Sequence, residues 1–351
     1  MDGTRKKYKF YSGLINSKAR LTYKQVETHL KGPSIIKQTM ISKSIKHLFD
    51  LTNLRLKLRN QRKALEINPK EAILELDRNK EVKNIVIKKP LFAHKLVEES
   101  MLLANESAAE FMHERLGLGV YRIHEDPEQQ KISELKNYIK QYGYSINSNE
   151  KNLAVSLNDL MKKIKGKPEE SSIEKFAIRS MSKAKYSTNK EKHFGLSFRH
   201  YTHFTSPIRR FPDVMVHRLI SDYTNGSNPK DKRYYDIMCK HSSKMEINAT
   251  KAERESIKFK QAEYMTNFIG KEFEAVVSGI TEWGMYGEIV ENHCEGLIRM
   301  SSMKDDRYEF DDQKIRIVGR NNKKIFRLGQ VIRVKVTDTD IEKRTIDLVL
   351  A

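Results

Sequence analysis

Residues 270–303 read GKEFEAVVSGITEWGMYGEIVENHCEGLIRMSSM, and this stretch decides the fold of the C-terminal part of the chain. From Phe273 onward, apolar and polar residues alternate with a period of two, which indicates half-buried strands, and glycine-rich turns separate them. After a charged loop, VIRVKVTD (331–338) and RTIDLVL (344–350) continue the alternation. The pattern predicts five short strands, a number and size typical of a small β-barrel.

Three side chains of the predicted barrel are candidates for ligand binding. Trp283 and Tyr286 lie around and just after the turn into the second strand, and His293 precedes Cys294. Five-stranded barrels of the OB type bind single-stranded nucleic acid by stacking bases on aromatic side chains beside a basic groove. The alternative is that Trp283 and Tyr286 only pack the barrel. Residues 271–350 closely resemble an S1-type RNA-binding domain, which implies that these side chains contact RNA.

The chain before residue 269 has the periodicity of helices. Apolar residues three or four positions apart predict helices within residues 34–63, at 91–116 up to Gly117, from about 172, and at 233–268. The predicted apolar face of the first helix consists of Ile41, Ile45, Leu48, Leu51 and Leu54. Two short strands around a turn at Asn79 form a hairpin. We therefore predict an α+β protein with a helix-rich domain at 1–268 and a barrel domain at 269–351.

The composition points to a polyanionic partner. The 351 residues contain 66 Lys and Arg against 46 Asp and Glu, a formal net charge of +20, so nucleic acid is the expected ligand. No apolar run approaches the roughly 18 residues needed to span a bilayer, and we predict a cytosolic protein without a membrane segment. Cys239 and Cys294 are far apart and fit neither a disulfide framework nor a zinc site.

Two arginines follow a proline turn in Ser206-Pro207-Ile208-Arg209-Arg210. Pro207 fixes its own φ and keeps the preceding residue extended, so the turn presents Arg209 from a defined position. A guanidinium binds a phosphodiester through two hydrogen bonds and stabilises the charge that develops in its transition state. Asp213 lies three residues after Arg210 and could pair with it on a helix. We expect Arg209 to meet phosphate and Arg210 to form an internal ion pair.

Four histidines lie within 25 positions, and they were considered as a metal site. They are His193, His200, His203 and His217. None has the spacing typical of zinc ligands, so hydrogen-bonded structural roles are favoured.

Three stretches of the chain resemble a known family, and they occur in the same order as in that family. Residues 193–220, HFGLSFRHYTHFTSPIRRFPDVMVHRLI, resemble the closing signature of the RNB catalytic domain of the RNase II and RNase R exoribonucleases. Residues 10–26, FYSGLINSKARLTYKQV, and 94–112, HKLVEESMLLANESAAEFM, are similar to two further stretches of that domain. The loop KDDRYEFDD (304–312) favours the RNase R branch. The resemblance implies hydrolysis of single-stranded RNA from its 3′ end to nucleoside 5′-monophosphates with Mg²⁺.

The resemblance also implies roles for individual residues. Arg209 falls on the family's catalytic arginine, and Glu98 on the glutamate that binds the sugar of the 3′-terminal nucleotide, a contact that distinguishes RNA from DNA. Arg210 and Tyr11 are further candidates for substrate binding. The alternative for Glu98 is that it and Glu99 interact with the dipole of a helix start.

One departure from the family pattern concerns the metal. The family's Mg²⁺ ligands form an acidic quartet, DxxxxxDxDD, and no such run occurs in this sequence. We therefore expect the chain to be the C-terminal portion of such an enzyme, truncated or paired with a separately encoded N-terminal half, and inactive alone. Two alternatives remain: a non-catalytic RNA-binding protein that acts through its barrel, and a role directed at DNA.

Overall fold

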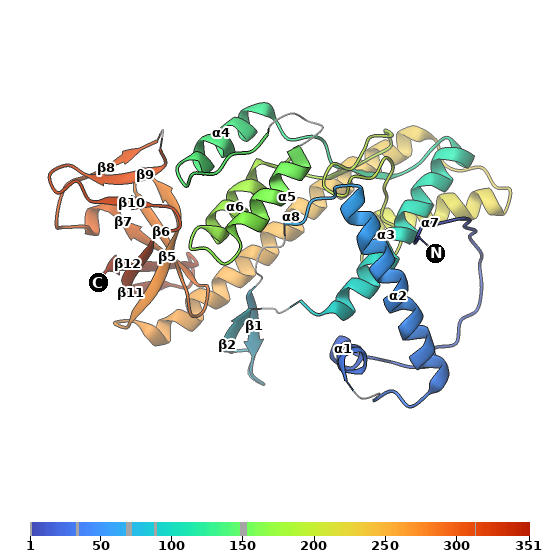
Figure 1. Ribbon diagram of the computed structural model, residues 1–351, viewed down its shortest axis with the longest axis horizontal. Helices are drawn as coiled ribbons and strands as arrows, with labels where there is room; N and C mark the ends of the chain where they lie inside the picture. Colours follow the sequence, from blue (N-terminus) through green and yellow to red (C-terminus); the bar gives the residue numbers. More distant parts are fainter. Residues whose placement is uncertain (1, 33–34, 68–71, 88–89, 148–152, 313) are drawn as a thin grey trace. The chain divides into compact units, whose positions relative to one another are not determined.

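The structure is a computed structural model that describes residues 2–32, 35–67, 72–87, 90–147, 153–312 and 314–351 (Figure 1). The chain forms two compact units, each built from three stretches of sequence. The first unit contains Met1–Leu65, Lys89–Asp126 and Ser182–Glu246, and the second contains Glu66–Lys88, Pro127–Met181 and Ile247–Ala351.

The first unit is mainly helical. Its elements are α1 (Tyr23–Lys31), α2 (Thr39–Gln61), α3 (Phe92–Phe111), a π-helical turn (Met112–Leu116), α7 (Phe211–Thr224), the start of α8 (Lys232–Met265), and the antiparallel strands β3 (Tyr121–Ile123) and β4 (Lys185–Ser187). Local signals set the helix ends. Thr22 caps α1 in a capping box with Gln25, and Gly117 ends the π-helical turn in the left-handed region at φ 68°.

The predicted helix is confirmed as α2, but the set of residues predicted to form its buried face is partly wrong. Ile45 is buried, but Leu48 is exposed, and Arg55 and Arg59 are buried in its place. Both arginines face glutamates of α3, with Arg59 Nη1 3.0 Å from Glu99 Oε1. Ion pairs between helices therefore replace part of the expected apolar contact. Ser34, in the predicted helix range, lies outside the described residues.

The second unit contains three shorter helices and a hairpin. The helices are α4 (Gln129–Lys140), α5 (Leu153–Ile164) and α6 (Glu170–Ser180), and the strands β1 (Ala72–Leu76) and β2 (Val82–Ile87) pair in antiparallel fashion. The hairpin predicted around Asn79 is confirmed. Asp77 stabilises its turn, because its carboxylate accepts hydrogen bonds from the backbone N–H groups of Asn79 (2.8 Å) and Glu81 (2.9 Å).

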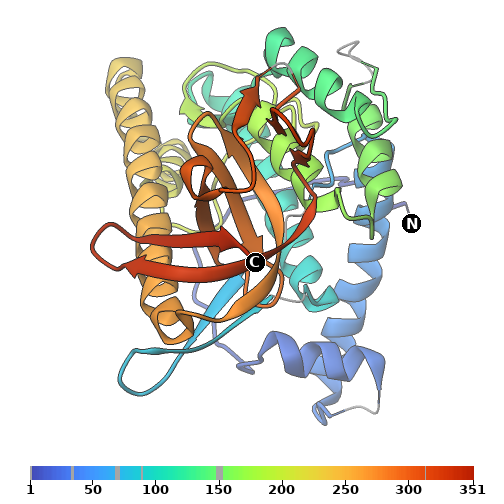
Figure 2. The same ribbon diagram turned by 90° about the vertical axis from the view of Figure 1, so that its left-hand side faces the viewer.

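The predicted five-stranded barrel is confirmed, with the strands in the expected places. Its strands are β5 (Glu272–Thr281), β6 (Gly284–Ile289), β7 (Glu295–Arg299), β11 (Val331–Asp340) and β12 (Thr345–Leu350), closed in the order β11-β12-β7-β6-β5. Figure 2 draws this part of the chain in orange to red. Strand alternation directs Met285, Ile298 and Val334 into the interior, where they are fully buried. Cys294 is also buried, and burial raises the pKa of its thiol to about 12. The same holds for Cys239 in the first unit, which makes both thiols unreactive.

The stretch expected to be a charged loop is in part a second sheet. Strands β8 (Tyr308–Asp311), β9 (Arg316–Gly319) and β10 (Ile325–Arg327) form it in the order β10-β9-β8. The prediction was wrong because these strands are only three or four residues long and lie among charged residues. Tyr308, Ile317 and Phe326 are nevertheless buried, one from each strand, and the rings of Tyr308 and Phe326 lie with their centroids 5.6 Å apart.

The helix at 233–268 is confirmed as α8 followed by a 3₁₀ turn (Thr266–Phe268), with Gly270 at φ 86° beyond it. The first barrel strand begins at Glu272, three residues after the boundary predicted at 269. The division into domains at 1–268 and 269–351 stays a prediction, because the compact units group the barrel with two earlier stretches. In the described part of the chain, no helix has the length and apolar character needed to cross a membrane.

Candidate functional site

The turn before α7 presents Arg209 as the sequence predicts. The backbone N–H groups of Arg209 and Arg210 both donate to the carbonyl oxygen of Ser206, at 3.3 and 3.1 Å, which closes the turn over Pro207. Arg209 is exposed, and none of the described acidic residues forms an ion pair with it. Its guanidinium is therefore available to bind an anion.

Arg210 differs from its neighbour. Its Nη2 donates to Asp213 Oδ1 at 2.7 Å, and the side chains of Arg210 and Asp213 are 17% and 0% exposed. The same carboxylate oxygen accepts the backbone N–H of Ser206 at 2.7 Å. Asp213 thus holds both ends of the turn. It also binds Arg210 in an internal ion pair, as the spacing of three residues between them predicts.

Glu98, on α3, lies between two cations. Its carboxylate accepts from Arg59 Nη1 at 2.5 Å and from Lys95 Nζ at 2.8 Å. Burial raises the pKa of Glu98, but the hydrogen bonds from Arg59 and Lys95 outweigh it and hold the pKa below the ordinary value. Glu98 is thus an ionised hydrogen-bond acceptor held in a fixed position. Its neighbour Glu99 is buried and pairs with Arg59.

Glu98 and Arg210 line the same cavity of about 320 Å³ in the first unit. Its other lining residues are Tyr23, His94, Val97, Met101, Leu102, Asn105 and Tyr201. Tyr23 packs its ring against His94, with centroids 4.2 Å apart, and Asn105 donates to the Tyr201 hydroxyl at 2.9 Å. Tyr23 was not among the predicted site residues, although it lies in the family-like stretch at 10–26. The cavity has an ionised acceptor and an aromatic ring, which suits the sugar of a nucleotide.

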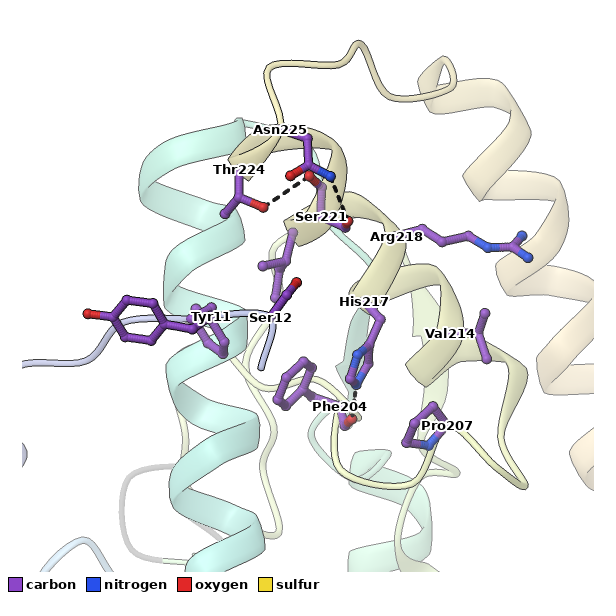
Figure 3. A pocket seen from close by; sticks show the side chains of 12 residues that line it. Tyr11, Ser12, Phe204, Pro207, Val214, His217, Arg218, Ser221, Thr224 and Asn225 are labelled. Carbon is purple, nitrogen blue, oxygen red and sulfur yellow. Dashed lines mark hydrogen bonds between the residues drawn. The ribbon is translucent and has the colours of Figure 1, made fainter. Parts of the chain in front are cut away.

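Tyr11 lines a different cavity, of about 640 Å³, together with Pro207 of the arginine turn (Figure 3). The Tyr11 ring is exposed, points away from the centre of this cavity, and has Lys9 Nζ 4.7 Å from its centroid. On the opposite wall His217 stacks on Phe204, with ring centroids 4.2 Å apart, and hydrogen-bonds the carbonyl oxygen of Phe204. Tyr11 and Glu98 are therefore not part of one pocket.

Three of the four histidines make the expected hydrogen bonds, whereas both ring nitrogens of His200 lack a partner among the described residues and its ring packs against His113, with centroids 4.2 Å apart. Tyr186 and His203 Nδ1 share a hydrogen bond of 2.8 Å, and the backbone N–H of Leu196 donates to His193 Nδ1 at 3.2 Å. Burial, and then nearby arginines, lowers the pKa of His203 to about 2. Burial and then His124 lower the pKa of His193 to about 3. Within the described ranges, no three His, Cys, Asp or Glu side chains are grouped so that they could hold a metal ion.

The carboxylates near the arginine turn do not fit a Mg²⁺ site. Magnesium requires carboxylates with free oxygens and near-octahedral geometry. Asp213 and Glu99 each keep one buried oxygen without a hydrogen-bond partner, but the other oxygen of each pairs with Arg210 or Arg59. In the described ranges, no third acidic or histidine side chain joins them to complete a metal site.

Trp283, in the barrel, is 55% exposed on the turn between β5 and β6. Its carbonyl oxygen accepts from the backbone N–H of Met300 at 2.9 Å. Gly284 follows at φ 153°, and a Cβ there would lie 2.2 Å from the carbonyl oxygen of Ile298. Only glycine fits so close to β7, so strand packing fixes the backbone that carries the Trp283 ring.

Tyr286 and His293 have different surroundings. Tyr286 lies half-buried on the outer face of β6, against Gly279 of the paired strand β5. His293 lies in the turn at the other end of β6 from Trp283, and its Nδ1 is 2.7 Å from Glu288 Oε1. Glu288 also pairs with Lys175 of α6. The turns that carry Trp283 and His293 therefore lie at opposite ends of β6, and the RNA contact expected of each side chain stays a prediction.

Comparison with known proteins identifies both parts of the chain. A family profile described as RNB domain matches residues 1–226, and one described as S1 RNA binding domain matches residues 266–350. Ribonuclease R of Thermotoga maritima is 37% identical over 359 residues, which covers 99% of this chain and 50% of that protein. Ribonuclease R of Escherichia coli is 30% identical, covering 98% of this chain and 44% of that protein. The chain spans about half the length of the curated relatives it matches.

Solved structures agree with this assignment. Mycoplasma genitalium RNase R in complex with ribose-methylated single-stranded RNA matches with a TM-score of 0.89 and 25% identity, over 94% of this chain and 53% of that chain. Yeast Ssd1, described as a pseudonuclease, matches in fold alone, with a TM-score of 0.63, 19% identity, and coverage of 85% and 37%. The chain therefore belongs to the RNB family, the family of the ribonuclease R exoribonucleases, and it ends in an S1 RNA-binding domain.

Proposed function

We propose that this chain forms the RNA-holding and charge-stabilising part of an exoribonuclease that hydrolyses single-stranded RNA from its 3′ end to nucleoside 5′-monophosphates. Membership of the RNB family supports the reaction class. The observation that carries the proposal is the contrast within the turn, where Arg210 is tied to Asp213 and Arg209 is exposed and unpaired among the described residues. The two buried free thiols also fit the cytosolic location predicted from the sequence.

Arg209 acts on the scissile phosphate. Its planar guanidinium donates two parallel hydrogen bonds to the phosphoryl oxygens and stabilises the charge that accumulates there in the transition state. The rigid turn keeps Arg209 in position before RNA binds, so little reorganisation is needed during the reaction. Arg210 acts indirectly, because its pair with Asp213 holds the turn in shape.

Glu98 binds the sugar of the terminal nucleotide. An ionised carboxylate accepts a hydrogen bond from a 2′-hydroxyl, which DNA lacks, so this contact favours RNA. Arg59 and Lys95 keep the acceptor ionised and in place. Tyr23, in the same cavity, offers a ring against which the sugar or base can pack.

In such an enzyme, the chemistry that bound metal ions would supply is activation of water and stabilisation of the leaving oxygen. The described carboxylates near Arg209 are committed to arginines, so we propose that the ligands come from polypeptide outside these 351 residues. The chain alone is then expected to bind RNA and not to hydrolyse it.

A nuclease assay tests the proposal. The purified chain is incubated with a labelled single-stranded oligoribonucleotide and Mg²⁺, alone and after co-expression with the part of T. maritima ribonuclease R that this chain does not match. We expect cleavage only in the second case. There Arg209→Ala should lower kcat by about 100- to 1000-fold with little change in KM. The control is Arg233→Ala, an exposed arginine of α8, which should leave kcat unchanged. Cleavage by the chain alone, or full activity of Arg209→Ala, would contradict the proposal.

The exposed Trp283 supports a second function, non-catalytic binding of single-stranded RNA through the S1 barrel. In that case the co-expressed pair shows no nuclease activity. Trp283→Ala then weakens RNA binding, and Arg209→Ala has no effect on any measured property.

A further inference from the structure

The cavity of about 320 Å³ that contains Glu98 is bordered on one side by a single face of α3. Glu98, Met101, Leu102 and Asn105 all line it, and steps of three and four residues place them in one row on a helix. At a rise of about 1.5 Å per residue, Glu98 and Asn105 lie about 10 Å apart along the helix axis. A ligand that contacts both ends of the row therefore does so with two different groups.

Asn105 lies at the end of the cavity nearest the arginine turn. Its side chain is buried, and its Oδ1 accepts the backbone N–H of Phe204 at 3.0 Å. Phe204 comes shortly before Ser206, whose carbonyl oxygen closes the turn. Arg210, from the end of the turn, lines the cavity as well. The cavity thus extends from Glu98 toward the arginine turn.

The contact with Phe204 fixes the orientation of the Asn105 amide. A backbone N–H can only donate, so the atom of Asn105 that faces it is the oxygen, and the NH₂ group faces the Tyr201 hydroxyl, 2.9 Å away. Because an amide NH₂ can only donate, the Tyr201 oxygen is the acceptor in that hydrogen bond. The hydroxyl proton of Tyr201 therefore points elsewhere.

The hydroxyl proton of Tyr201 has no acceptor among the described residues. The side chain is 5% exposed and lines the cavity. Burial raises the pKa of Tyr201, so the hydroxyl keeps its proton at neutral pH. A buried donor without an acceptor is unfavourable, and a ligand that accepts its proton removes this cost. Tyr201 thus offers a hydrogen bond to a molecule that occupies the cavity.

The position of this hydroxyl is fixed before a ligand arrives. The Tyr201 ring stacks on Phe198, with centroids 5.5 Å apart and an angle of 9° between the planes. His193 and His203 pack edge-to-face with it, at centroid distances of 5.3 and 5.7 Å. These contacts hold the ring and Asn105 holds the oxygen, so a hydrogen bond to a ligand requires little further ordering.

We propose that Tyr201 is a further substrate-binding residue, whose hydroxyl donates a hydrogen bond to an oxygen of the 5′-phosphate of the terminal nucleotide, and that Asn105 positions this hydroxyl. The inference rests on the proposed function, which places the sugar of that nucleotide at Glu98. With the sugar there, the phosphate lies farther along the row, toward Tyr201 and the arginine turn. A phosphate oxygen is charged, and a charged acceptor forms a stronger hydrogen bond than the neutral oxygens of a sugar.

Binding of the product and of its dephosphorylated form tests the inference on the chain alone. Isothermal titration calorimetry measures the affinities of adenosine 5′-monophosphate and adenosine, which differ only in the phosphate. Tyr201→Phe removes the hydroxyl and keeps the ring, so it should weaken binding of the monophosphate about 10-fold and that of adenosine less than about 2-fold. The matched control is Tyr121→Phe, which removes another buried hydroxyl of the first unit, one without a partner, and should change neither affinity.

Asn105→Leu tests the positioning role at similar side-chain size. It should lower the preference for the monophosphate over adenosine, as Tyr201→Phe does. Because Asn105 acts through Tyr201, the double variant should lose no more of this preference than Tyr201→Phe alone. A purely structural role of Asn105 would weaken binding of both ligands equally. Circular dichroism of each free variant checks that it is folded, and Asn105→Leu provides the comparison if Tyr201→Phe does not fold.

A third ligand separates the two ends of the cavity. The wild-type chain should bind 2′-deoxyadenosine 5′-monophosphate more weakly than the ribonucleotide, because the contact with Glu98 is lost. Tyr201→Phe should leave the ratio of these two affinities unchanged. A changed ratio would place the hydroxyl proton of Tyr201 on the sugar and overturn the phosphate contact.

Three further results would overturn the inference. These are no binding of the monophosphate by the wild-type chain, an unchanged preference for the monophosphate in Tyr201→Phe, or an equal loss of both ligands in that variant.

The inference and the proposed function can fail separately. If the co-expressed pair described above cleaves RNA, and Tyr201→Phe changes neither kcat nor binding of the monophosphate, only the role of Tyr201 is refuted. If binding of the monophosphate depends on Tyr201 but the co-expressed pair shows no nuclease activity, only the proposed reaction is refuted.

Discussion

The barrel and the first unit differ in how completely their backbone and charged groups find partners within the chain. The barrel closes on itself, so each of its five strands has two neighbours, and the strands carry Trp283 in a fixed, exposed position. In the first unit, Arg209 is exposed without an ion-pair partner among the described residues, and residues 11–22 are uncovered. Under the proposed function, this difference implies that the barrel would bind RNA by itself, whereas the first unit would need metal ligands from other polypeptide for catalysis.

The largest expected effect tests the contrast between Arg209 and Arg210. Asp213→Ala removes the partner of a largely buried guanidinium, and breaking such a pair costs about 3 to 5 kcal/mol in the free energy of unfolding. Arg209→Ala, one residue before the pair, should change it by less than about 0.5 kcal/mol. Urea unfolding followed by circular dichroism measures both. Equal losses for the two variants would show that Arg209 is also structural.

The next effect tests the self-sufficiency of the barrel. Trp283→Ala should weaken binding of a single-stranded oligoribonucleotide by about 1 to 3 kcal/mol, the contribution of one base stacked on an aromatic ring. Fluorescence anisotropy with a labelled oligonucleotide measures the affinity of the chain alone. Val331→Ala, which shortens another exposed apolar residue of the barrel, is the control and should bind normally. Unchanged affinity of Trp283→Ala would remove the stacking role.

A smaller effect concerns acid stability of the first unit. Burial lowers the pKa of His193 and His203 well below 6.5, so each contributes stability that is full above pH 6.5 and is lost as the pH falls toward its folded value. The loss approaches about 1.4 kcal/mol per pH unit for each histidine. His203→Asn should therefore reduce the difference in unfolding free energy between pH 7 and pH 5. Urea unfolding at both pH values measures this, and an unchanged difference would mean that His203 is protonated in the folded state.

The smallest effect concerns Glu98. Because its pKa is lowered, its ion pairs stabilise the fold above about pH 4.5 and lose this contribution as the pH falls through the lowered value. Its side chain is 37% exposed, so solvent screening limits the contribution to less than about 1 kcal/mol. Glu98→Gln should be slightly less stable than wild type at pH 7, and this difference should shrink as the pH falls below 4.5. A difference that does not shrink would point to lost packing instead of lost charge.

The barrel could be predicted from the sequence because its signal is local. Residues of β5 and β6 alternate between interior and surface, and glycines mark the turns. The strands β8 and β9 escaped prediction because four residues are too few for a period to be recognised among charged neighbours. The length of each strand therefore decided whether it could be predicted.

The site was predictable only in part, because its contacts join distant stretches. The pair of Arg210 with Asp213 follows from a spacing of three residues on a helix start. The pair of Arg59 with Glu98 joins α2 and α3 across 39 positions, and one sequence carries no signal for it. For the same reason, the burial of Arg59 on a helix face expected to be apolar could not be foreseen.

The tight contact at Gly284 has a consequence for the thermodynamics of RNA recognition. The backbone beside Trp283 packs closely against β7, so the turn that carries the ring is already ordered in the free protein. A nucleotide that stacks on the ring would therefore lose little binding free energy to ordering of this turn. Gly284→Ala would push the strands apart and loosen this platform, so it would lower affinity for RNA without removing a single atom that touches the ligand.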